Sequence, residues 1–145
     1  MTRSKLAFIA LCSILIACNS SKDLGLSQHQ VERFHQEYSA GQDQQAYDEA
    51  SPIFHKAVGY SKWLSLRSVV RSRLGRVRGA ERRSFKEWMI NGDHMVELIY
   101  QTKFENGSGA EKFTWQFEGA TARLAGYYIN LPLDAFPNSP TSNSR

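Results

Sequence analysis

The chain has 145 residues and a formal net charge of +4, and 41% of its residues are hydrophobic. This length is enough for one globular domain with a modest core. The charge is too small to indicate a nucleic-acid-binding protein and the sequence contains no nucleic-acid recognition motif, so we expect no nucleic-acid partner.

Residues 1–17 have the pattern of an export signal. Two basic residues, Arg3 and Lys5, precede the uncharged run 6–18, which is shorter than the roughly 17–25 apolar residues that span a bilayer. The run ends in Leu15-Ile16-Ala17-Cys18, which resembles a bacterial lipobox. In such proteins the cysteine thiol receives a diacylglyceryl group and the peptide is cut just before it. The alternative is an ordinary secretory signal that ends in a chance cysteine.

Cleavage before Cys18 would leave a mature chain with a net charge of +2 and one cysteine, because Cys12 is removed. A single lipidated cysteine excludes a disulfide and an all-cysteine metal site. We therefore predict an extracytoplasmic protein that a lipid anchors to the membrane. Asn19 follows the cysteine where inner-membrane lipoproteins tend to have aspartate, which favours the periplasmic face of the outer membrane in a Gram-negative cell.

The mature chain divides into three segments. Residues 18–26 are the lipidated cysteine and a polar tether, which would reach about 15 Å as flexible coil. Residues 27–131 form a single domain. Residues 132–145 have no apolar periodicity and are expected to be a flexible tail.

The first half of the domain predicts three helices. Ser27 has a capping-box signal for the first helix, which Gly41 ends. Asp43 can cap a second helix, and the Ser51-Pro52 pair breaks it or begins a further turn. Ser61 can cap a third, which ends at Gly75. The apolar residues that repeat at helical spacing are Val31, Phe34 and Tyr38 in the first helix and Trp63, Leu66, Val70 and Leu74 in the third.

The second half predicts strands. Phe113, Trp115 and Phe117 alternate with polar residues, as in a half-buried strand. Asn91-Gly92 and the segment 106–109 are typical hairpin turns, and a last strand follows Gly119. Helices followed by such a meander indicate an α+β fold with three N-terminal helices packed on a curved, antiparallel, four-stranded sheet.

The chain resembles a bacterial family known as domain of unknown function 4019, over about residues 30–130. The resemblance rests on the stretch 41–54, on Trp63, Arg71, Leu74, Gly75 and Arg76, and on the closing segment 126–129. Asp43 and Tyr47 depart from the family pattern. The family consists mostly of small secreted or lipid-anchored proteins and implies no established activity. At a greater remove, the order of elements is similar to cystatin-like and nuclear-transport-factor-like cones, which host enzymes, binders and scaffolds.

Residues 62–86 form a basic run, which contains nine lysines and arginines and only one acidic residue, Glu81. One interpretation is a patch for an anionic lipid or an acidic envelope protein, because arginine suits phosphate and carboxylate groups. The other is a solvated helix face followed by an edge strand protected by charge, with arginines paired to glutamates. The predicted patch consists of Arg67, Arg71, Arg73, Arg76, Arg78, Arg82 and Arg83.

The four histidines lie at no metal-ligand spacing, and we predict no metal ligands, cofactor or catalytic residues. An enzyme of the hydrolase or isomerase type stays an alternative, with His55 as base and Asp48 or Glu49 to orient it. Aromatic residues offer a second alternative, a pocket for a small ligand, unless they simply form the core. The predicted pocket aromatics are Trp63, Trp88, Trp115 and Tyr128. The leading interpretation is non-enzymatic interaction or binding at the cell envelope.

Overall fold

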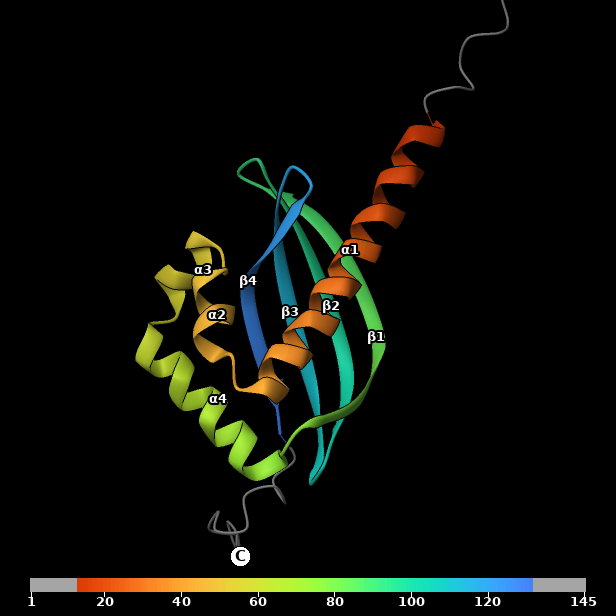
Figure 1. Ribbon diagram of the computed structural model, residues 1–145. Coiled ribbons are helices and arrows are strands. Elements are labelled where there is room, and N and C mark those ends of the chain that lie inside the picture. Colours follow the sequence, from red (N-terminus) through yellow and green to blue (C-terminus); the bar gives the residue numbers. More distant parts are fainter. Residues whose placement is uncertain (1–12, 132–145) are drawn as a thin grey trace, which may run out of the picture.

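The computed structural model of the protein describes residues 13–131, with side chains from Ser21 onward. Four helices precede four strands (Figure 1). The helices are α1 (Ser13–Ala40), α2 (Asp43–Asp48), α3 (Pro52–Ala57) and α4 (Tyr60–Leu74), and the strands are β1 (Val77–Ile90), β2 (Asp93–Phe104), β3 (Gly107–Glu118) and β4 (Thr121–Asn130). The predicted α+β class is confirmed. The Ser51-Pro52 break starts a separate helix, so the described helices number four and not three.

The strands form one antiparallel sheet in the order β1-β2-β3-β4. Helix α1 crosses one face of this curved sheet, and α2, α3 and α4 lie beside β4 (Figure 1). The predicted hairpin at Asn91-Gly92 is present, and both of its residues have positive φ angles of 52° and 87°. Such angles suit a tight hairpin turn. Strand β1 is an edge strand, as the charge-protected interpretation of the basic run expected.

Helix α1 begins much earlier than the sequence predicted. Residues 19–26 are helical, so the expected coil tether is wrong, and Ser27 is a buried residue inside the helix and not its N-cap. Leu24 and Leu26 pack against the core, and these tertiary contacts stabilise a segment with poor helix propensity. The predicted signal residues 1–12 and the tail 132–145 lie outside the described residues.

Aromatic side chains fill the space between α1, α3, α4 and the sheet. Phe34 meets Phe113 with ring centroids 5.1 Å apart, and Phe54 meets Trp63 at 5.3 Å. The inward alternation predicted for β3 is confirmed, because Phe113, Trp115 and Phe117 are all buried. Edge-to-face pairs of this kind add about 0.5–1.5 kcal/mol each beyond their burial.

The sequence predicted the end of α4 correctly but not its beginning. Gly59, not Ser61, is the N-cap of α4, and the α3 cap is Ser51, whose Oγ accepts the Phe54 N–H at 3.3 Å. Gly75 ends α4 as predicted, with φ of 73°. A Cβ at this position would lie 2.5 Å from a carboxylate oxygen of Glu105. Both the positive φ angle and this close approach therefore favour glycine.

Candidate functional site

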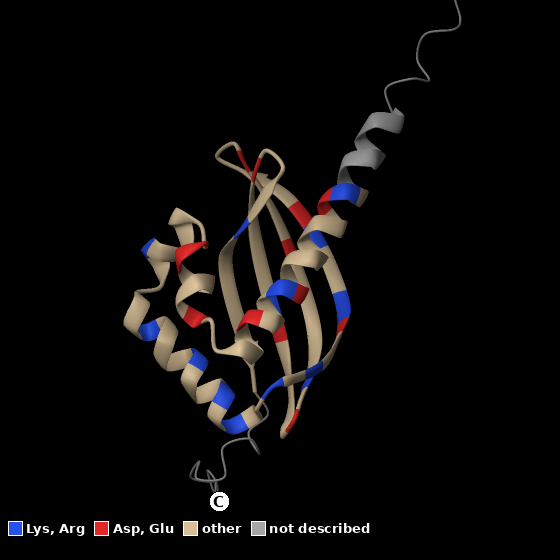
Figure 2. Ribbon diagram, in the orientation of Figure 1, with Lys and Arg blue, Asp and Glu red and all other residues tan. Residues whose placement is uncertain are grey.

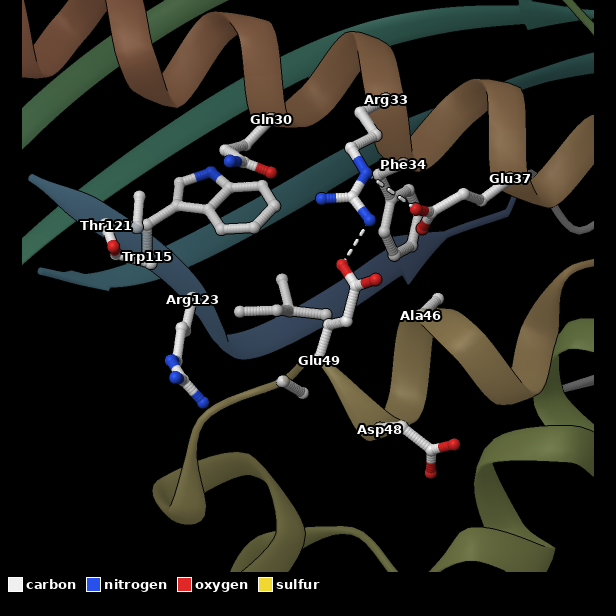
Figure 3. Close-up of a pocket in the computed structure, with 13 residues that line it drawn as sticks. Gln30, Arg33, Phe34, Glu37, Ala46, Asp48, Glu49, Trp115, Thr121 and Arg123 are labelled. Atoms are coloured by element: carbon white, nitrogen blue, oxygen red, sulfur yellow. Dashed lines mark hydrogen bonds and ion pairs between the residues drawn. The ribbon is translucent and has the colours of Figure 1, made fainter. Parts of the chain in front are cut away.

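A cleft of about 310 Å³ opens between α1, α2 and the β3–β4 part of the sheet (Figure 3). Its floor is apolar, with Phe34, Trp115 and Leu124, and its rim is charged. This volume lies at the lower end of the range of small-molecule sites, and a few polar groups over an apolar floor are typical of them.

Charges of both signs meet at the rim of this cleft. Arg33 on α1 pairs with Glu37 one turn along, with 2.9 Å between Arg33 Nε and Glu37 Oε1, and it also bonds Glu49 of the α2–α3 connection (Figure 3). Burial raises the pKa of the Glu37 carboxyl, and the nearby Arg33 only partly offsets this. Arg123 on β4 lies 3.4 Å from Glu118 and completes the rim.

The indole of Trp115 carries the most unusual polar group of this cleft. The side chain is 3% exposed, and its Nε1 is buried without a hydrogen-bond partner among the described residues. In Figure 3 the nitrogen edge of the ring is turned toward α1, where Gln30 lies. A buried donor without a partner costs about 1–3 kcal/mol, so an acceptor placed here would be favoured.

A second polar site surrounds Glu111 on β3, which is 2% exposed. Its Oε2 accepts hydrogen bonds from His35 Nε2 at 2.7 Å and from the Thr102 hydroxyl at 2.5 Å. Its Oε1 accepts the Tyr127 hydroxyl at 2.6 Å. Burial alone would raise the pKa of Glu111, but hydrogen bonding and attraction by His35, together with the two hydroxyls, hold it below its usual value.

A second cleft of about 490 Å³ lies between α1 and strands β1 and β2, and His35 lines it with Ser39, Tyr100 and Arg82. The sequence prediction missed the Glu111 site, because its four side chains come from α1, β2, β3 and β4. One signal could have found it: extending the inward alternation of Phe113 and Trp115 back by two residues places Glu111 inside the fold.

The seven arginines of the predicted anionic patch do not share one surface. Arg67 is 1% exposed, so its assignment to a surface patch is wrong. Its guanidinium carbon lies 4.4 Å from the centroid of Phe34 and 4.9 Å from that of Trp63, while its Nε bonds Asp43 at 2.8 Å. Arg71 also bonds Asp43, at 2.7 Å, so Asp43 joins α2 to α4 and does not cap α2.

The other arginines are exposed, and several have carboxylate partners. Arg76 and Arg78 share Glu105 at 3.1 Å and 2.7 Å, and Arg83 lies 3.0 Å from Glu81. Figure 2 places the basic residues at the end of α4 and the start of β1 opposite the N-terminal end of α1. Exposed residues in this group are Arg73, Arg76, Arg78, Arg82 and Arg83.

The four aromatic residues of the predicted pocket also lie in different parts of the fold. Trp115 lines the cleft of Figure 3, but Trp63 is fully buried core and donates its Nε1 to the Asp43 carbonyl at 2.9 Å. Tyr128 is 59% exposed on β4, and the half-buried Trp88 lies on β1. The single aromatic pocket is therefore wrong, and only Trp115 of the four lines a cleft described here.

His55, the base considered for an enzyme, is exposed on α3. Its Nε2 lies 2.6 Å from the Tyr47 carbonyl, and it lines neither described cleft. Asp48 and Glu49 line the cleft of Figure 3 instead. A different histidine meets carboxylates: His94 lies 2.6 Å from Glu87 and 3.8 Å from Asp23, which joins α1 to the β1–β2 hairpin.

The fold is thus an α+β domain in which helices cover a four-stranded antiparallel sheet, with a cleft on each side of α1. The chain belongs to the family described as "Protein of unknown function (DUF4019)", whose model matches residues 31–127. A search of curated proteins found no match to the chain. Among the helices that the structure describes, none is long and apolar enough to cross a membrane.

Proposed function

We propose that the protein is a lipid-anchored, extracytoplasmic, non-enzymatic binding domain, and that the cleft of Figure 3 holds a small ligand. The lipobox-like residues 15–18 support the anchor and the cellular location. The main support for the binding site is the buried indole N–H of Trp115, which has no hydrogen-bond partner among the described residues. The preferred ligand is flat and largely apolar and carries one hydrogen-bond acceptor.

The charges of the cleft restrict the ligand further. Arg33 is already neutralised by Glu37 and Glu49, and Asp48 adds another carboxylate to the lining. A strongly anionic ligand would therefore meet as much repulsion as attraction. This argues for an uncharged or zwitterionic ligand in this cleft.

Saturation-transfer NMR with benzamide, a flat ring with one amide oxygen, tests this proposal. Trp115→Phe keeps the ring surface and removes the N–H, so the affinity should fall about fivefold, the value of one ordinary hydrogen bond. Trp88→Phe changes a tryptophan outside the cleft and should leave binding unchanged. Absence of transfer to benzamide, or equal losses in both variants, would contradict the proposed site.

The hydrolase or isomerase alternative has one supporting observation, the His35–Glu111 pair beside the second cleft. Glu111 engages Nε2 of His35, which leaves Nδ1 as the ring atom that could exchange a proton. His35→Gln should then abolish hydrolysis of an activated ester such as 4-nitrophenyl acetate above the buffer rate. Hydrolysis that is equal in wild type and variant would remove this alternative.

A further inference from the structure

The β1–β2 hairpin ends in an exposed apolar tip. Met89 and Ile90 are 63% and 50% exposed, and together with Tyr128 at 59% they are the three most exposed large hydrophobic residues among those that the structure describes. Trp88 precedes Met89 and is half-buried. None of the three apolar residues of the hairpin tip is part of the core clusters of the described residues.

This tip lies at the same end of the molecule as the N-terminal part of α1 (Figure 1). The contact between Asp23, His94 and Glu87 fixes the two elements against each other. From Asp23, five residues of helix lead to Cys18, about 7.5 Å. From Glu87, three residues of strand lead to Ile90, about 10 Å. The cysteine and the tip therefore each lie within about 10 Å of chain from this contact.

The geometry points to a membrane-inserting hairpin: we propose that Trp88, Met89 and Ile90 enter the interface of the phospholipid bilayer that holds the lipid on Cys18. This inference rests on the proposed lipid anchor and adds a second, non-covalent contact to it. Because the two acyl chains of a diacylglyceryl group already give stable attachment, the hairpin would hold the domain against the bilayer in addition to that anchor.

The distribution of apolar groups favours a bilayer over a protein partner. Successive strand residues point to opposite faces, so Met89 and Ile90 make both faces of the tip apolar. A bilayer surrounds such a tip, whereas a protein would cover one face. Trp88 is the residue type found at membrane interfaces, and the Lys86 ammonium lies 5.3 Å from the centroid of its ring.

The charges near the tip also indicate which lipids are needed. Lys86 is accompanied by Glu87 and Asp93, and the next hairpin contains Glu118, so the tip carries no excess of positive charge. The exposed arginines of α4 and early β1 lie at the opposite end (Figure 2). Insertion should therefore need no anionic lipid and occur in phosphatidylcholine alone.

The test uses the mature lipidated protein in phosphatidylcholine nanodiscs whose acyl chains are brominated near the headgroup. Trp63 and Trp115 are buried, so the difference between wild type and Trp88→Phe isolates the Trp88 emission. That emission should drop about twofold or more, because an interfacial indole touches the upper acyl chain. Met89→Asp with Ile90→Asp should restore it while the protein stays attached. Val69→Asp, an exposed apolar residue of α4, is the matched control and should change nothing.

Each outcome decides between the two proposals. Attachment to the nanodisc without quenching of Trp88 overturns the hairpin proposal and leaves the lipid anchor intact. Failure to attach overturns both. Quenching that survives the double aspartate variant overturns the assignment of Met89 and Ile90.

Discussion

Replacement of Glu111 by glutamine is the sharpest test of the buried polar site. The carboxylate is 2% exposed and accepts three hydrogen bonds, from His35, Thr102 and Tyr127. Glutamine keeps the shape but removes the charge, and its amide nitrogen must face at least one donor. Hydrogen bonds to a charged group contribute about 1.5–3 kcal/mol each, and a broken buried pair costs about 3–5 kcal/mol. We expect Glu111→Gln to lower the free energy of unfolding by about 3 kcal/mol.

The pH dependence gives an independent check. The folded pKa of Glu111 lies below its unfolded value, so its contribution is fully present above the unfolded pKa, about 4.3. It is lost as the pH falls through the folded pKa. Urea unfolding from pH 7 downward should therefore show wild type losing stability below about pH 4.5 more steeply than Glu111→Gln does.

The matched control is Glu105→Gln, because Glu105 is a surface carboxylate that also accepts several bonds. Its pKa is lowered, first by the Arg76 backbone N–H and then by the Arg76 side chain. Solvent screens such a site, so its substitution should have a much smaller effect at pH 7. Two results would refute the assignment of Glu111 as an ionised, stabilising group. One is equal urea midpoints for wild type and Glu111→Gln at pH 7, and the other is an equal loss of unfolding free energy in both proteins as the pH falls.

Three further changes test other parts of the structure. Arg67→Ala should lower the free energy of unfolding by about 3–5 kcal/mol in urea titrations, because it leaves a cavity among aromatic rings; Arg67→Met should cost clearly less, and equal losses would argue against the buried environment. Gly75→Ala should cost about 1–3 kcal/mol, since the positive φ and the Glu105 contact both oppose a Cβ; an unchanged thermal midpoint would contradict it. Cys18→Ser should release the protein from membranes or stall its processing in cell fractionation; membrane attachment that survived would contradict lipidation.

The parts of the fold that sequence reasoning predicted are those in which local pattern and tertiary packing agree. The strict alternation around Phe113 and Trp115 identified β3, and Gly75 marked the end of α4 because only glycine fits that backbone. The start of α1 was not predictable in this way. Its residues 19–26 have weak helix propensity, and the helix there depends on the packing of Leu24 and Leu26 against distant elements.

The candidate sites show the same division. Arg67 and Arg71 lie one helical turn apart and were expected to share a face, and they do share Asp43. The sequence could not show that this face is turned inward, because that depends on how α4 packs against α1 and α2. The run of positive charges in the sequence therefore predicted a surface patch. In the structure Arg67 and Arg71 instead pair with Asp43 and join α4 to α2, and the other arginines do not share one surface.

The continuity of α1 has a mechanical consequence. If lipid is attached at Cys18, one continuous helix carries the anchor and lines both clefts. Its 23 residues from 18 to 40 form a rod about 34 Å long. A coil would let the domain tumble and sweep a hemisphere above the bilayer; a rod keeps each cleft at a set height and direction. Ligands and partners would then have to arrive at that height. Replacing residues 19–23 with glycine and serine would leave the attachment intact while freeing the orientation.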